Sequence, residues 1–382
     1  MEKIKVLHVF QRMRTGGAET LIMNIFRKMD HERIQFDFLC MSNEPGEYDD
    51  EIKENGGNIF IIDSPKECGA IKHILQIIKV IKSNNGYDII HVPTMFHSGI
   101  VCFAAFLAGV KVRIVHSHNA SEFNRNTIKR RIYRTLSRLM IALFCTDKIA
   151  CGYKARDYLF GNSKKIQRET MILYNGIDLH KYKFIDIDLV SELKKEFDIS
   201  DEIIIGNVAR FEEQKNHIFF IRFAQYLKDK KIPAKIILVG DGKLKQEIEA
   251  QVKKNRLESY INFAGVRTNI PEFMNLFDVY IMPSLYEGFP LTVVEALASG
   301  TNCVLSDTIS KEVSIIDDAV KFVGLDDDLS KWYNAVITCN NKKTDRNKYI
   351  EILKEKGFSS EYTTNKLVNF YLKKGSEIYE KK

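Results

Sequence analysis

Two carboxylates, Glu287 and Glu295, flank a short loop in the segment VYIMPSLYEGFPLTVVEALAS, residues 279–299. The apolar run Val279–Met282 predicts a buried strand, and helical periodicity begins at about Leu291, which places Glu295 in the first turn or so of a helix. Unpaired N–H groups at a helix start suit a phosphate, and carboxylates suit hydroxyl groups. Together they indicate a sugar nucleotide. The alternative is a surface loop with two solvated glutamates.

Two cations follow another predicted strand, Ile203–Ala209. Arg210 presents a planar fork of donors and Lys215 a point charge, a pair that suits a diphosphate. Carboxyl ends of parallel strands share one sheet edge, where ligands bind. Either residue alone would be read as a solvated cation. Their joint placement with the loop of Glu287 favours one shared anionic ligand.

The first half of the chain offers weaker candidates. Gly16 and Gly17 open the first predicted helix, where glycine lets a ligand approach the backbone, although a Gly-Gly pair is usually only a turn. His118 follows the predicted strand Lys111–Val115, at a sheet edge where it can hydrogen-bond a substrate. A structural histidine is the equally open alternative.

Composition predicts a globular protein: of 382 residues, 45% are hydrophobic and 28% charged. The seven cysteines are scattered without metal-ligand spacing, which is typical of reduced thiols in the cytosol. Residues 1–10 lead directly into a strand pattern, so we expect no signal peptide and a cytoplasmic protein. The longest apolar run, Ile100–Val110, is too short to span a bilayer.

Positive charge is concentrated in the first half. Residues 1–170 contain 26 basic and 18 acidic side chains, against 31 and 32 in the remainder. Residues 125–138 are rich in arginine and include the stripe Arg130, Arg134 and Arg138 beside an apolar stripe from Ile128 to Leu143. Such a helix can lie on an anionic membrane surface. The alternative is a core-facing helix with a solvated basic face, and nucleic acid is a weaker third, since no recognised module is present.

Alternation of apolar runs with helical patterns predicts an α/β fold with two doubly wound, Rossmann-like parallel sheets. We expect domains at residues 1–175 and 176–358, with their ligand crevices facing a common cleft, and a C-terminal helix at 359–382 crossing back to the first domain. Helices are expected at 66–82 and 98–109 in the first domain and at 216–228 in the second. Polar sequence through Ser200 is read as the connection between domains. Asp326–Asp328 is read as a helix cap, with a metal site as the alternative.

The chain resembles the retaining glycosyltransferases of family 4, which have the GT-B fold. Residues 287–295, EGFPLTVVE, match the family's E-x7-E signature. Further segments agree in the family's order, over nearly the whole chain: Gly16–Glu19, Asn175–Asp178, Ala209–Arg210 with Lys215–Asn216, Val239–Gly242 and Phe263–Val266. The C-terminal domain matches best. The N-terminal domain, which in this family meets the acceptor, matches at Gly16–Glu19 and around His118.

The resemblance implies roles for these residues. Glu295 would bind the ribose hydroxyls and Glu287 a hydroxyl of the donor sugar, while Arg210 and Lys215 would neutralise the diphosphate. His118 would contact the sugar from the other domain. Backbone around the remaining positions would hold sugar, diphosphate and base: Gly16, Gly17, Gly240, Val266, Arg267, Gly288, Phe289, Leu291 and Thr292.

The expected chemistry is transfer from a nucleoside diphosphate sugar. Arg210, Lys215 and the helix start can stabilise the departing diphosphate without a metal, in line with the metal independence that the resemblance implies, and no cofactor is expected. No carboxylate nucleophile of the kind that retaining glycosidases use stands out. The resemblance instead implies a front-face displacement in which the leaving phosphate helps to deprotonate the acceptor.

We therefore expect a hexosyltransferase that uses a UDP-sugar and a glycan or polyprenyl-linked acceptor in capsular or exopolysaccharide synthesis. Peripheral contact with the inner face of the membrane through residues 125–138 is part of this expectation. Two alternatives stay open: a UDP-sugar epimerase of the same fold, and a non-catalytic nucleotide-binding subunit. A dehydrogenase is disfavoured because G-x-G-x-x-G is missing, and a P-loop kinase because G-x-x-x-x-G-K-[ST] is missing.

Overall fold

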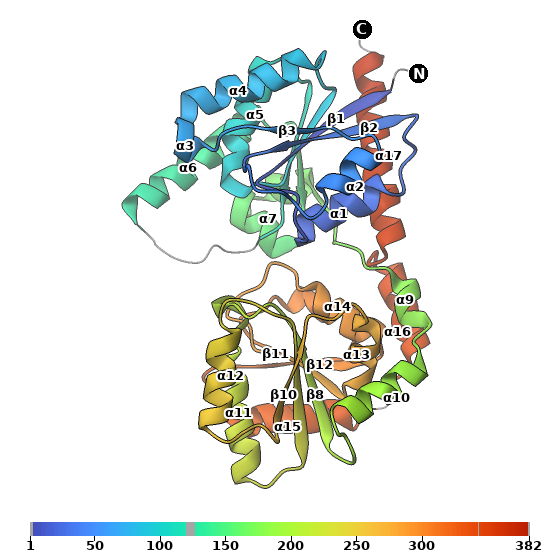
Figure 1. Ribbon diagram of the computed structural model, residues 1–382. Helices are drawn as coiled ribbons and strands as arrows, with labels where there is room; N and C mark the ends of the chain where they lie inside the picture. Colours follow the sequence, from blue (N-terminus) through green and yellow to red (C-terminus); the bar gives the residue numbers. More distant parts are fainter. Residues whose placement is uncertain (1–2, 120–126, 343, 381–382) are drawn as a thin grey trace. The chain divides into compact units, whose positions relative to one another are not determined.

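A computed structural model describes residues 3–119, 127–342 and 344–380 of the protein. The chain divides into two compact α/β units (Figure 1). Unit 1 comprises Met1–Gly176 and Ser360–Lys382, and unit 2 comprises Ile177–Ser359. The chain thus leaves unit 1, builds all of unit 2, and returns to unit 1.

Unit 1 is a seven-stranded sheet with helices on both faces. Its strands are β1 Ile4–Phe10, β2 Ile34–Cys40, β3 Ile59–Ile61, β4 Ile89–Val92, β5 Val112–Ser117, β6 Asp147–Ala150 and β7 Thr170–Ile172. Its helices are α1 Gly17–Phe26, α2 Asp49–Glu54, α3 Pro65–Cys68, α4 Ala70–Ser83, α5 Ser98–Leu107, α6 Ile128–Phe144, α7 Tyr153–Phe160, α8 Lys164–Glu169 and α17 Ser360–Tyr379, with a 3₁₀ turn at Met95–His97.

Unit 2 is a six-stranded sheet built in the same way. Its strands are β8 Ile203–Val208, β9 Ala234–Val239, β10 Ile261–Gly265, β11 Val279–Met282, β12 Asn302–Ser306 and β13 Val320–Val323. Its helices are α9 Leu179–Lys183, α10 Ile187–Glu196, α11 Ile218–Asp229, α12 Lys245–Lys254, α13 Ile270–Leu276, α14 Leu291–Ala298, α15 Leu329–Asn340 and α16 Arg346–Glu355, with 3₁₀ turns at Glu213–Lys215 and Lys311–Val313.

All strand pairs in both sheets are parallel, so the predicted α/β fold with two doubly wound sheets is confirmed. The strand order is β3-β2-β1-β4-β5-β6-β7 in unit 1 and β10-β9-β8-β11-β12-β13 in unit 2. The order reverses between β1 and β4 and between β8 and β11. Loops diverge at such a switch point and leave a crevice at the carboxyl ends of the strands, which is where α/β sheets bind ligands.

Helix α17 follows unit 2 in the sequence but packs into the core of unit 1. Leu367, Tyr371 and Ile378 are buried with the apolar side chains of β1, β2 and α1. Gly375 permits this close approach, because a Cβ atom there would lie 2.2 Å from the Ile4 side chain. The opposite face of the sheet is covered by α4, α5 and α7 and by α6, from which Ile141 is buried and Tyr133 and Phe144 are partly buried.

The structure differs from the predicted elements in two places. The helix expected over 66–82 is divided into α3 and α4 at Gly69, whose φ of +81° breaks the helix. The segment through Ser200, read as a connection, contains α9 and α10. Helix α10 was missed because only Val190 and Leu193 of its ten residues are buried, so its apolar signal is weak. The cap at Asp328 is confirmed, since its carboxylate accepts the Ser330 N–H at 2.8 Å.

Residues 128–143 belong to helix α6, and the prediction that their apolar stripe faces the core is wrong. Its apolar stripe is exposed, whereas Arg134 and Arg138 lie against aromatic side chains and backbone of unit 1. Arg125, expected in the same basic helix, lies outside the described residues. None of the described helices has the length and apolar character needed to cross a membrane.

Candidate functional site

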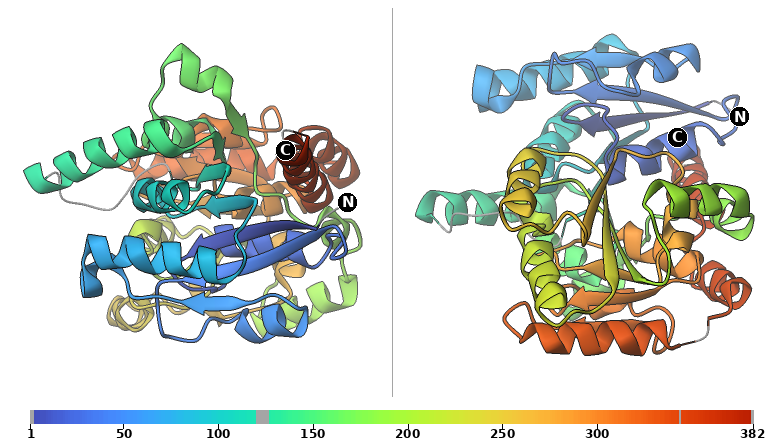
Figure 2. Two further views of the ribbon diagram at one scale, coloured as in Figure 1. Left: turned by 90° about the horizontal axis from the view of Figure 1, so that it is seen from above. Right: turned by 60° about the horizontal axis from the view of Figure 1, so that its bottom comes forward.

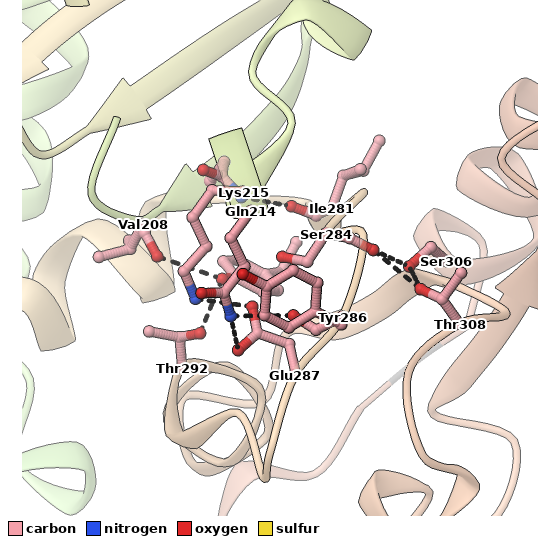
Figure 3. Close-up of polar contacts among 12 residues, drawn as sticks. Val208, Gln214, Lys215, Ile281, Ser284, Tyr286, Glu287, Thr292, Ser306 and Thr308 are labelled. Atoms are coloured by element: carbon pink, nitrogen blue, oxygen red, sulfur yellow. Dashed lines mark hydrogen bonds and ion pairs between the residues drawn. The ribbon is translucent and has the colours of Figure 1, made fainter. Parts of the chain in front are cut away.

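The loops that follow β8 and β11 meet at the switch point of unit 2. They are joined by an ion pair in which Lys215 Nζ lies 2.6 Å from Glu287 Oε1 (Figure 3). Both side chains are shielded, with 23% of the lysine and 8% of the glutamate exposed. Shielding from water strengthens the attraction between the two charges. Lys215, assigned to the diphosphate, and Glu287, assigned to the sugar, therefore form a single ion pair.

Gln214 fixes the loop that carries Glu287. Its side-chain amide donates to the Tyr286 carbonyl at 2.9 Å and to Glu287 Oε2 at 3.3 Å (Figure 3). Its main-chain carbonyl accepts the Leu285 N–H at 2.8 Å. Both carboxylate oxygens of Glu287 are thus engaged from the β8 side. Each oxygen keeps a lone pair for a further donor such as a sugar hydroxyl.

Thr292 is held at the start of α14 by a residue of the sheet. The Tyr280 hydroxyl lies 2.9 Å from Thr292 Oγ1 and 3.4 Å from the Val208 carbonyl (Figure 3). Burial raises the pKa of Tyr280, so its proton stays available as a donor. Farther along the same edge, the Ser284 carbonyl accepts the hydroxyls of Ser306 at 2.6 Å and Thr308 at 2.9 Å. The loop between β11 and α14 is therefore attached to β8, β11 and β12.

Glu295 is the fifth residue of α14, in agreement with its expected place in the first turn or so of the helix. The hydroxyl of Tyr182, on α9, is the polar group that acts on its carboxylate. Burial raises the pKa of Glu295, and the Tyr182 hydroxyl opposes that shift as a donor. Burial and the neighbouring charge of Glu295 likewise raise the pKa of Tyr182. Glu295 is therefore a poorly hydrated carboxyl group with a hydroxyl donor nearby.

Gly240 follows β9, the strand next to β8, and a larger residue would not fit there. Its φ is +135°, and a Cβ atom would lie 2.1 Å from the Ala209 carbonyl oxygen. Gly242 has a similar constraint against the backbone of Phe211. The two glycines let the loop after β9 lie directly against the loop after β8, which carries Arg210.

The remaining candidates of unit 2 are placed on the same sheet edge with different exposure. Arg210 is exposed, and its guanidinium lies 3.8 Å from Glu212, so it is available for an anion. Arg267 is paired with Glu196 and donates to the Ala264 carbonyl at 2.7 Å, which leaves its neighbour Val266 as the exposed residue after β10. Phe289 stacks on Phe358 with ring centroids 5.4 Å apart.

Gly288 and Leu291 stand on either side of Phe289 and Pro290, in the loop and at the first residue of α14. Because Phe289 turns its ring toward Phe358, this stretch offers backbone N–H groups to a ligand more than side chains. That is the arrangement expected for an anion or sugar at the start of α14.

Unit 1 carries the other candidates on its own sheet edge. Gly16 and Gly17 begin α1 after β1, and the Asn175 side chain donates to the Gly17 carbonyl at 3.4 Å. His118 follows β5, with its ring 3.9 Å from that of His116. Neither ring nitrogen of His118 has a hydrogen-bond partner within the described ranges, and burial lowers its pKa to about 3. It is therefore a neutral imidazole.

A line of buried histidines stands behind His118. His91 Nε2 lies 3.1 Å from His116 Nδ1, and His91 Nδ1 contacts the hydroxyl of Tyr371 on α17. Burial, with a smaller effect from His118, lowers the pKa of His91 to about 3 and that of His116 well below 6.5. The edge of unit 1 thus presents neutral rings and no fixed charge at these positions.

Comparison with known proteins decides the family. The model of glycosyltransferase family 4 matches residues 15–181, and that of glycosyl transferases group 1 matches residues 190–356. The putative glycosyltransferase EpsF of Bacillus subtilis (strain 168) is 37% identical over 368 residues, covering 96% of each chain. The chain belongs to glycosyltransferase family 4.

Two further proteins resemble this glycosyltransferase over most of its length. The UDP-Gal:alpha-D-GlcNAc-diphosphoundecaprenol alpha-1,3-galactosyltransferase of Escherichia coli is 25% identical, covering 89% of both chains. The crystal structure of Anabaena HepE in complex with UDP and glucose superposes with a TM-score of 0.74 at 18% identity, covering 96% of this chain and 99% of that one. At that identity HepE supports the fold.

Sequence reasoning missed three residues that organise this glycosyltransferase's candidate site. Gln214 and Tyr280 bond to the loop of Glu287 and to Thr292, and Tyr182 bonds to Glu295. Gln214 precedes Lys215 directly, so its position after β8 was a usable signal. Tyr182 had no such signal, because α9 was read as connecting sequence.

Proposed function

We propose that this glycosyltransferase transfers a hexose from a UDP-sugar to a polyprenyl-linked or other glycan acceptor, with retention of anomeric configuration. The setting would be cell-surface polysaccharide synthesis at the inner face of the membrane. The observation that carries the proposal is the Lys215–Glu287 pair at the switch point of unit 2, at 2.6 Å. A cation and a carboxylate stand side by side there, and this supports the binding of a diphosphate-linked sugar.

The proposed roles follow from the donors and acceptors that remain. Lys215 uses one N–H bond on Glu287, which leaves two for phosphate oxygens, and Arg210 is exposed on the same edge. These cations and the N–H groups at the start of α14 would stabilise the departing diphosphate. The reaction would then need no metal or other cofactor, and activity should survive chelation of divalent cations.

Glu287 would accept a hydroxyl of the donor sugar while Lys215 and Gln214 hold its carboxylate in place. Glu295, oriented by Tyr182, would bind the ribose hydroxyls. The leaving phosphate would take the acceptor proton in a front-face displacement. His118, neutral at physiological pH, would donate to or accept from the sugar.

The nature of the substrates is supported by the names of related proteins. The relative from Escherichia coli is named for a UDP-sugar donor and a diphosphoundecaprenol-linked acceptor, and HepE was crystallised with UDP and glucose. We extend both features to this chain as part of the proposal.

The test is incubation with a panel of UDP-sugars, with and without a polyprenyl diphosphate-linked monosaccharide. We expect a product only when both substrates are present, with the donor's anomeric configuration retained by NMR. Conversion of the UDP-sugar without acceptor would instead indicate an epimerase. An inverted product would overturn the retaining mechanism, and loss of activity in EDTA would overturn the metal-independent one.

The Glu287→Gln variant distinguishes two roles of this carboxylate: positioning the donor sugar and stabilising the positive charge that develops on it. We expect nearly unchanged affinity for the UDP-sugar and a turnover lowered by about 10²–10³-fold, because the negative charge that faces the developing positive charge on the sugar is lost. Full turnover with unchanged affinity would restrict Glu287 to positioning the donor. The measurement is kcat and KM with purified protein.

A further inference from the structure

Helix α6 exposes a continuous apolar stripe to solvent. Its members recur at intervals of three and four residues, and between 55% and 76% of each remains exposed: Ile128, Ile132, Leu136, Leu139 and Leu143. Figures 1 and 2 show α6 extending outward from unit 1. Single exposed apolar residues are ordinary on protein surfaces, but a contiguous row of large ones usually marks an interaction site.

The neighbouring helix α5 also exposes apolar side chains at its end next to α6. Phe106, at the end of α5, has its ring centroid 5.4 Å from that of Phe144, which ends α6. Phe106 and Leu107 are themselves 51% and 50% exposed. The apolar surface is therefore shared by two helices of the same unit, and we call it the α6 surface.

Positive charge borders the α6 surface on both sides. At 3.6 residues per turn, Lys129 and Arg131 fall on opposite flanks of Ile128 and Ile132, and both are exposed. The 17 residues of α6 include no acidic side chain. An apolar row between cations is the pattern of a helix that lies in the plane of an anionic membrane.

The arginine stripe is not the outward face. Arg134 lies over the rings of Phe96 and Tyr158, and Arg138 donates to the carbonyl groups of Tyr158 and Leu159. These two arginines attach α6 to unit 1. They hold the helix so that its apolar side faces away from the protein.

We propose that the α6 surface inserts into the headgroup region of an anionic lipid bilayer, with Lys129 and Arg131 on lipid phosphates. The inference deepens the proposed function, on which it rests for its biological purpose, since a polyprenyl-linked acceptor resides in such a bilayer. A second copy of this chain is the competing occupant. In a two-fold pairing of α6 with α6, the cations of one copy would meet those of the other, which disfavours a dimer.

The test compares binding to vesicles made from equal parts of phosphatidylglycerol and phosphatidylcholine. Ile132→Ser with Leu136→Ser should reduce the bound fraction by tenfold or more, because two side chains lose their burial in lipid. Folding should be unaffected, since both positions are exposed. Lys129→Glu with Arg131→Glu should also reduce binding, and salt should weaken the wild type.

A matched control is Ile187→Ser with Leu189→Ser on α10 of unit 2. These residues are also exposed, but they stand next to Asp186 and Asp188. We expect unchanged vesicle binding. Equal binding by the Ile132/Leu136 variant and the wild type, or an equal loss in the control, would overturn the proposal. So would a wild-type dimer that the Ile132/Leu136 variant converts to monomer in analytical ultracentrifugation.

Sugar transfer to a water-soluble acceptor distinguishes the two proposals. The Ile132/Leu136 variant should keep this activity while losing transfer to acceptor embedded in vesicles. If the wild type binds vesicles as described but transfers no sugar to any acceptor, the proposed function fails and the membrane surface stands. If it transfers sugar but binds no vesicles, the membrane surface fails alone.

Discussion

The ligand edges of the two sheets differ in how they hold their polar side chains. At the edge of unit 2, charged groups are bonded to one another or to fixed donors, as in Lys215–Glu287 and Tyr182–Glu295. At the edge of unit 1, His91 and His116 are buried, His118 is partly buried, and all three rings are neutral. The edge of unit 2 thus holds charged side chains in fixed positions, whereas the edge of unit 1 presents uncharged imidazole rings.

The difference agrees with the proposed function, in which the two units bind different parts of the substrates. A diphosphate carries several negative charges and needs fixed cations, whereas a sugar or a glycan needs uncharged hydrogen-bonding groups and flat surfaces. Fixed charges also cost little reorganisation when charge develops during a reaction. We therefore expect charge changes in unit 2 to alter catalysis most, and acid to affect unit 1 most.

The largest effect is expected from Lys215→Met. It removes a shielded cation and leaves Glu287 without its counter-ion, so kcat/KM with the UDP-sugar should fall by about 10²–10³-fold. The control is Lys331→Met, which removes the exposed pair that Lys331 forms with Asp327 at 2.5 Å. The Lys331→Met variant should have the same initial rates as the wild type. If Lys215→Met lowers kcat/KM by less than threefold, the Lys215–Glu287 pair is not part of the mechanism.

The second effect is the response to acid. Six histidines of unit 1 have pKa values lowered by burial: His8, His73, His91, His97, His116 and His118. Below pH 6.5 the unfolded chain binds protons that the folded unit does not, so the stability of unit 1 should fall as the pH falls from 6.5 toward 3. Above pH 6.5 both states are neutral and the contribution vanishes.

Unit 2 has a smaller and mixed response. His217 acts in the same direction, with its pKa lowered to about 4, but the raised pKa of Glu295 acts oppositely. Folded Glu295 takes up a proton at a higher pH than its unfolded value of 4.5, so this group gains stability as the pH falls through that window. Hydrogen exchange by mass spectrometry, corrected for intrinsic rates, should show unit 1 losing protection first between pH 7 and pH 5. Earlier loss in unit 2 would contradict the comparison.

The third effect comes from Tyr182→Phe, which deletes the hydroxyl that bonds to Glu295. A hydrogen bond to a charged group is worth about 1.5–3 kcal/mol, so we expect KM for the UDP-sugar to rise by tenfold or more with a smaller change in kcat. Tyr349→Phe is the matched control, since its buried hydroxyl bonds to Asn302 at 3.1 Å away from the site. If both variants raise KM equally, Tyr182 acts through stability alone.

The sheets were predictable because their strands are apolar runs that alternate with helices, and parallel strands buried on both faces leave that pattern. The loop from Glu287 to Glu295 was predictable for the same reason, as it stands between a clear strand and a clear helix. Its edge partners Arg210 and Gly240 followed from their positions just after strands, and Lys215 from its place in the same loop as Arg210.

The sequence did not predict correctly in which direction side chains point. The stripe from Ile128 to Leu143 has helical spacing, but spacing does not say whether a helix turns that side inward. Here the opposite side is buried, at Ser137 and Ile141. The pairing of Lys215 with Glu287, 72 residues apart, depends on β8 and β11 being neighbours. A single sequence does not contain that strand order.

The return of the chain from unit 2 to unit 1 has a consequence for biosynthesis. Residues 177–359 contain every strand of unit 2, and Ile177 donates its N–H to the Phe358 carbonyl at 2.9 Å, so this unit can close once its own residues have left the ribosome. Unit 1 lacks α17, with Leu367 and Tyr371, until residues 360–379 are made. Unit 1 is therefore begun before unit 2 and completed after it, and a stop codon just after residue 359 would damage the packing of residues 1–176.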